Sequence, residues 1–398
     1  MKLMYQTSEL CPPLDPITAA FFWRLKADRL LKVELDADPG QIHSGFDPPN
    51  LDPASGENDD PSVYWASVVQ DSTNNIVNLN IPGGNFSNFE WIKNSGDGAT
   101  VSHDESATGD SVDLDIDATG SGDAIQVAEF YLVVKQTTQR LITLNVMVLP
   151  PRGPISLGVY NIEDSSSPGT KFATSPTVSK ANPASVVSMC NDVFHQAGIT
   201  FLQDPSSGNK SVAYDTHKLE WDPNFGYWNP VPTGPDGKVS TPEYNAIATG
   251  EQYPATIDVF FLKNSGNVYF EYINNPDPLF RRGSGGDPTT PEAYLFVSNS
   301  QHYINIAAAH EVGHVLGLSV ANNANDTGLH DNPPYSNAVV NDVSNLTPPS
   351  APSGHQSSPN AALMQSGSPG ANGLLAWPWG RWMRHEDWRE ANTNANSL

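Results

Sequence analysis

The chain has 398 residues, more than one ordinary hydrophobic core requires, and this length predicts two domains. Lys and Arg number 20 against 44 Asp and Glu, and the resulting net charge of −24 argues against nucleic acid and anionic membranes as partners. The 2 cysteines exclude a disulfide framework, no apolar run is long enough for a membrane span, and no signal peptide is recognisable at the N-terminus. Acidic stretches such as DLDIDATGSGD (113–123) leave calcium open as a ligand without supporting it.

The first part of the chain is predicted to be all-β. From about residue 28 to residue 149, short alternating or β-branched runs are separated by clusters of Gly, Asn, Asp and Ser. Examples are VYWASVVQ (63–70), AEFYLVVKQ (128–136) and RLITLNVMVL (140–149). This rhythm is typical of an antiparallel, immunoglobulin-like sandwich. We expect an accessory sandwich domain over residues 1–150, which ends where PPRGP (150–154) forms a stiff joint.

The second part, residues 151–398, is predicted to alternate strands and helices. A run with helical spacing, NPASVVSMCNDVFHQAG (182–198), includes Cys190 among apolar residues, which favours a core thiol over a reactive one. Runs typical of strands lie on either side of it, and GSGGDP (283–288) is expected to be a loop. A second helix carries AAAHEVGHVLGL (307–318), residues 319–380 lack periodicity, and helical character returns at 380–392. The predicted fold class is therefore α+β, with a mixed twisted sheet backed by two long helices.

The stretch HEVGH (310–314) carries the residues best suited to chemistry. Residues four apart lie on one face of a helix, so His310 and His314 could direct their imidazoles at a single zinc ion. Glu311 would lie beside that ion, where a carboxylate can take a proton from a water molecule and pass it to a leaving amine. The alternative is an ordinary amphipathic helix whose two histidines form hydrogen bonds within the fold and bind no metal. The adjoining alanines and Gly313 favour a tightly packed metal helix.

Gly317 follows the second histidine by three residues and would allow the chain to turn back toward the ion. With it, AHEVGHVLGLS (309–319) resembles the metzincin clan of zinc peptidases, whose helix carries HExxHxxG. The resemblance implies that His310 and His314 are zinc ligands, Glu311 is the general base, and a third histidine ligand follows the glycine.

The third ligand is not at the position where the clan has it, because residue 320 is a valine. His330, followed by Asp331 as a supporting partner, is similar to the adamalysin-type pattern and requires a loop about ten residues longer, which costs little closure entropy. His355 in GHQSSPNAALM resembles the matrixin pattern and requires a longer insertion. We favour His330 over His355. The third alternative is that no protein ligand exists.

A methionine downstream completes the resemblance. Met364 in AALMQSG (361–367) looks like the methionine of the clan's Met-turn, whereas Ser366 stands where some metzincins have a supporting tyrosine. AYLFVSN (293–299) is similar to the edge strand along which a peptide substrate pairs. The resemblance covers about residues 155–398, with specific motifs at 309–318 and 361–367 only.

These observations predict a zinc endopeptidase that acts on protein or peptide substrates and, by family resemblance, is secreted. A different class of function stays open, because Val320 and Ser366 are also consistent with a non-catalytic binding or adhesion protein built on a degenerate peptidase scaffold. A metal-dependent hydrolase of another bond, such as an amide in a cell-wall peptide, is the third alternative.

Overall fold

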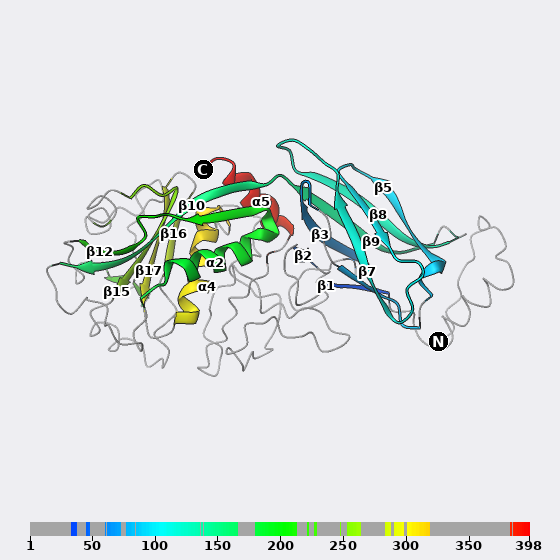
Figure 1. Cartoon of the computed structure of the whole chain (residues 1–398), viewed down its shortest axis with the longest axis horizontal. Helices are drawn as coiled ribbons and strands as arrows, with labels where there is room; N and C mark the ends of the chain where they lie inside the picture. The colour runs from blue at the N-terminus through cyan, green and yellow to red at the C-terminus, as the bar shows by residue number, and fades with distance from the viewer. Residues whose placement is uncertain are drawn as a thin grey trace.

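The computed structural model places a β-sandwich and a mixed sheet side by side, with the last helix, α5 (His385–Ala395), between them (Figure 1). It describes residues 33–37, 45–47, 60, 62–72, 77–83, 85–135, 137, 139–165, 180–212, 221–222, 227–228, 247, 253–263, 283–287, 290–297, 301–318, 383 and 385–398. Within these residues no helix is both long and apolar enough to cross a membrane.

The N-terminal half is built from two sheets. One has the order β1 (Glu34–Ala37), β4 (Val77–Asn80), β7 (Ser111–Ala118), β6 (Ala99–His103). The other has the order β2 (Phe46–Asp47), β3 (Val63–Val69), β9 (Arg140–Leu149), β8 (Gln126–Val134), β5 (Phe89–Ser95), and the 3-10 turn η1 (Phe86–Asn88) precedes β5. Alternate residues of β7 are buried, as a strand with one solvated face requires. The expectation of a wholly antiparallel sandwich is wrong in one pairing, since β3 and β9 run parallel.

The C-terminal half contains a mixed sheet of order β11 (Ile199–Gln203), β10 (Arg152–Asp164), β15 (Ile257–Lys263), β17 (Thr290–Val297), β16 (Gly283–Asp287). β12 (Gly208–Val212) also pairs with β10, and β13 (Trp221–Asp222) pairs with β14 (Tyr227–Trp228). All pairings of the mixed sheet are parallel except that of β16 with β17.

Two expectations about this sheet are wrong. The segment GSGGD is a strand rather than a loop, and among the strands that the structure describes it is the outermost of the sheet, beside β17. AYLFV therefore lies inside the sheet, between β15 and β16, and is not the edge strand. The glycines of β16 obscured it in the sequence because pairing through backbone N–H and C=O groups needs no β-branched side chain.

Helices α2 (Pro183–Phe194) and α4 (Gln301–Val315) pack on the mixed sheet, and the 3-10 turn η3 (His195–Ala197) follows α2. Asn182 caps α2 by accepting from the Ala184 N–H, and Gly198 ends the η3 turn in the left-handed region. Cys190 is fully buried, and this burial raises the pKa of its thiol. The prediction of a core cysteine on a helix is confirmed.

Two hydrophobic clusters organise the described residues. One fills the space between the sheets of the sandwich, and the other joins the mixed sheet to α2, α4 and α5 (His385–Ala395). The chain passes between them at the end of β9, where Met147 and Leu149 already belong to the second cluster. The long strand β10 continues into the mixed sheet just beyond this point (Figure 1).

Candidate metal centre

Helix α4 holds polar groups in an otherwise apolar setting. Every residue from 308 to 318 is buried except the partly buried His314, and most of the others are apolar. A helix surrounded by core excludes side chains that need water, so a buried histidine and carboxylate there require partners or a ligand. His310 and Glu311 are each only 5% exposed. This is the setting expected of a functional site on a rigid helix.

The two histidines of the motif lie on successive turns of α4. Their ring centroids are 4.9 Å apart and their planes are nearly perpendicular, at 86°. Residues four apart on a helix stack along one face, which explains the short separation. Glu311 is adjacent in sequence, so its side chain leaves the helix about 100° away from that of His310. The structure therefore brings His310 and His314 together and keeps Glu311 on the same helical turn.

Gly317 ends α4 as the sequence predicts. Its φ of +84° is in the left-handed region, which a residue with a Cβ adopts only at a cost. The N–H of Leu318 donates to the carbonyl of Gly313, and the N–H of Gly317 donates to the carbonyl of His314, both at 2.9 Å. These two bonds are the pair that defines a Schellman motif. The chain is thereby turned sharply immediately after the second histidine.

The turn also fixes the protonation pattern of His314. Its Nδ1 lies 3.1 Å from the backbone carbonyl oxygen of Leu318. A carbonyl oxygen can only accept, so Nδ1 carries the proton and, in the neutral ring, Nε2 keeps its lone pair. Metal-bound histidines in proteins usually donate their other N–H in this way. The structure thus presents a ring nitrogen suited to a metal ion.

The residues present fit zinc, which takes neutral imidazole nitrogens in a tetrahedral site. Two imidazoles on one rigid helix supply two of the ligands, and a buried carboxylate lies beside them. The candidates for the remaining positions fall outside the described residues. These candidates are His330 and His355. Asp331, the expected supporting partner of His330, Met364 of the expected Met-turn and the departures Val320 and Ser366 fall there too.

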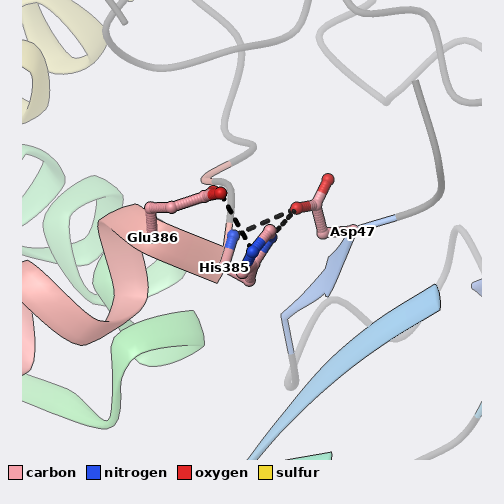
Figure 2. A group of neighbouring side chains, drawn as sticks. All are labelled: Asp47, His385 and Glu386. Atoms are coloured by element: carbon pink, nitrogen blue, oxygen red, sulfur yellow. Dashed lines mark hydrogen bonds and ion pairs between the residues drawn. The ribbon is translucent and has the colours of Figure 1, made fainter. Parts of the chain in front are cut away.

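A second histidine cluster lies between the two halves of the molecule (Figure 2). His385 at the start of α5 has Nδ1 2.6 Å from Oδ2 of Asp47 in β2 and Nε2 2.9 Å from Oε1 of Glu386. Its ring stacks on Trp65 of β3 with 4.1 Å between centroids and 5° between planes. Burial of the ring opposes protonation, but the two carboxylates outweigh it and raise the pKa of His385 to about 9.

The ligand atoms of Asp47, His385 and Glu386 lie within 4.8 Å of one another, which makes the cluster a second candidate for metal binding. Its geometry favours a different role. Both ring nitrogens face carboxylate oxygens at hydrogen-bonding distance, and only the imidazolium can donate from both. A metal ion requires a deprotonated nitrogen. We therefore interpret the cluster as an ion pair that fixes α5 to the sandwich.

The far face of the mixed sheet holds a third polar group. Asp258 on β15 is paired in register with Glu292 on β17, close to the hydroxyl of Tyr160 on β10. Burial raises the pKa of Asp258 to about 7, Tyr160 partly offsets this, and the charges of Glu292 and Asp204 add to it. The helices pack on the opposite face, against Val259 and its neighbours, so this carboxyl group is separate from the histidines of α4.

Sequence reasoning missed two residues with clear structural roles. Asp47 is 338 positions from His385, and no local pattern links the two. Asn394, in a polar C-terminal stretch typical of a disordered tail, donates from its Nδ2 to the carbonyl of Leu316 at 2.8 Å. Contacts of this kind depend on how distant segments pack and leave no periodic signal in the sequence.

No model of a known protein family matches this chain, and a search of curated proteins finds no match.

Proposed function

We propose that this protein is a zinc-dependent endopeptidase of the metzincin type. The observation that carries the proposal is the end of α4, where two neighbouring histidines, a buried glutamate and a left-handed glycine lie close together. His310 and His314 would hold the ion, and because Nδ1 of His314 donates to the Leu318 carbonyl, this ring would bind the ion through Nε2.

The proposed chemistry assigns a proton transfer to Glu311. A bound zinc ion would supply Lewis acidity at the scissile carbonyl. The carboxylate of Glu311 would take a proton from the attacking water and later deliver it to the nitrogen of the departing amine.

The outer strand β16 supports a peptide as the substrate. Its partner β17 occupies one side, and α4 packs against both strands. An extended peptide that added to the outer side of β16 would gain backbone hydrogen bonds without regard to its side chains. Such a peptide would run past the helix that carries the histidines, which places a susceptible bond near the proposed ion.

The rest of the site is assigned by resemblance. His330 would be the third ligand with Asp331 as its supporting partner, His355 is the alternative ligand, and Met364 would lie in the Met-turn. The sandwich, residues 1–150, would be an accessory domain of the peptidase domain 151–398, and the protein would be secreted.

The test is cleavage of an unfolded protein such as reduced casein by the full chain. We expect hydrolysis that a zinc chelator abolishes and added zinc restores. Glu311→Gln should lower kcat/KM by about 10²–10⁴ while zinc stays bound, because general acid–base catalysis contributes factors of this size. Asp97→Asn is the control, since the Asp97 side chain is 96% exposed in the sandwich. Unimpaired cleavage by Glu311→Gln, or none by the zinc-loaded wild type, would overturn the proposal and favour a binding protein.

A further inference from the structure

The C-terminal helix α5 reaches the end of the metal helix. The Nδ2 of Asn394 donates to the carbonyl of Leu316, one of the α4 carbonyls without a partner inside the helix. A Cβ added at Gly317 would collide with this same amide nitrogen. Asn394 therefore packs directly against the left-handed residue of the turn and satisfies the carbonyl just before it.

The turn around Gly317 connects Asn394 to the proposed zinc ligand His314 through two backbone carbonyls. Leu316 and Leu318 flank Gly317, and both leucines are fully buried. The carbonyl of Leu318 accepts from Nδ1 of His314. The position of that carbonyl follows from the left-handed conformation of Gly317, which a glycine adopts without a steric cost. Asn394 contacts this turn from the neighbouring helix, and Glu390 of the same helix lies slightly farther from it.

The remainder of α5 is firmly anchored, so Asn394 is held from a rigid element. Asn392 is fully buried and donates to the carbonyls of Pro150 and Ala197, each at 2.8 Å. Trp388 is fully buried against Gly45 of the sandwich. A helix fixed in this way can hold a donor against a turn with little entropic cost on binding a metal.

We propose that Asn394 is a positioning residue of the metal site, which acts through the Gly317 turn and the Leu318 carbonyl to orient the imidazole of His314. The inference rests on the proposed function, because it gives His314 the role of a zinc ligand. It adds α5, which no motif in the sequence marks, to the elements that build the site.

The experiment measures the zinc affinity of the full chain with a competing chelator, and the tautomer of His314 in the metal-free protein by nitrogen-15 NMR. Asn394→Ala should weaken zinc binding about tenfold, the lower end of effects seen when the partners behind metal ligands are removed. Asn394→Asp should weaken it more, since it keeps the shape but turns an acceptor toward the Leu316 carbonyl. Both should shift His314 from the Nδ1-protonated form to a mixture.

Thr393→Ala is the matched control. Thr393 is exposed on the same turn of α5, and its Oγ1 donates to the Arg389 carbonyl of the same helix. The Thr393→Ala variant should therefore show the zinc affinity and the His314 signal of the wild type. Wild-type affinity and tautomer in both Asn394 variants would overturn the inference and leave the proposed function standing. A wild type that binds no zinc would overturn the proposed function, and the assignment of Asn394 to a metal site with it.

Discussion

The two histidine clusters of this protein differ in what faces the ring nitrogens. At His385 both nitrogens lie against carboxylates, and the ring also stacks on an indole. At His314 one nitrogen lies against a backbone carbonyl, which a neutral ring satisfies. The first arrangement requires a proton on both ring nitrogens, whereas the hydrogen bond of the second requires one on Nδ1 only.

The partners of the ring nitrogens distinguish the histidine that we interpret as structural from the one that we propose as a zinc ligand. His385 has two carboxylates beside its ring, and its hydrogen bonds use the nitrogens that a metal would need. At His314 the Leu318 carbonyl faces Nδ1, which is the arrangement expected of a ring that binds a metal through Nε2. The partner of each nitrogen, rather than the density of potential ligands, indicates which site suits a metal ion.

The largest expected effect is a loss of zinc binding, which should occur on substitution at one of the two histidine clusters and not at the other. His314→Ala should abolish stoichiometric binding, because the proposed site then keeps only two of its three histidine ligands. His385→Ala should bind zinc as the wild type does. Zinc content after dialysis, measured by atomic emission, gives the answer. If His385→Ala lost its zinc and His314→Ala kept it, the roles assigned to the two clusters would be reversed.

A smaller effect is expected from Gly317→Ala. The left-handed φ of +84° and the collision with Asn394 should together lower the free energy of unfolding by about 2 kcal/mol and weaken zinc binding. Gly83→Ala is the control, since its φ of +65° is also left-handed but a Cβ there would meet nothing within 4 Å. It should lose about 1 kcal/mol and bind zinc normally. Urea unfolding and chelator competition distinguish the two variants, and equal zinc affinities would disprove the role of the turn.

The smallest effect concerns the ion pair at His385 and depends on pH. The pKa in the folded protein, about 9, is above the ordinary value of 6.5, so protonation stabilises the fold. The contribution is complete below about pH 6.5 and is lost as pH rises through about 9. His385→Ala should therefore cost roughly 1–3 kcal/mol at pH 6 and much less at pH 10. Denaturant unfolding at the two pH values measures this, and a pH-independent loss would contradict the imidazolium.

Patterns within one element predicted the structure well, and contacts between elements did not follow from the sequence. The spacing of Val186, Cys190 and Val193 predicted α2, and Gly317 predicted the end of α4, because period and backbone conformation are local properties. The strand β16 was missed because its glycines pair through the backbone alone. Asp47 and Asn394 were missed because their partners are far away in the sequence.

In the candidate site, too, local features were predictable and long-range contacts were not. His310, Glu311 and His314 lie on one helix, so their spacing predicted their proximity. The identity of the proposed third ligand depends on the path of the segment after Gly317. No periodicity in the sequence of that segment predicts its path. His330 and His355 therefore stay alternatives, each with its own motif and its own length of intervening chain.

The most direct test of the central claim is a zinc-edge anomalous difference map from crystals of the full chain. We predict one strong peak about 2.0–2.1 Å from a nitrogen of each of His310 and His314, completed by His330 or, failing that, by His355. A peak at His385 instead, or no peak from crystals soaked in zinc, would contradict the assignment of α4 as the metal helix.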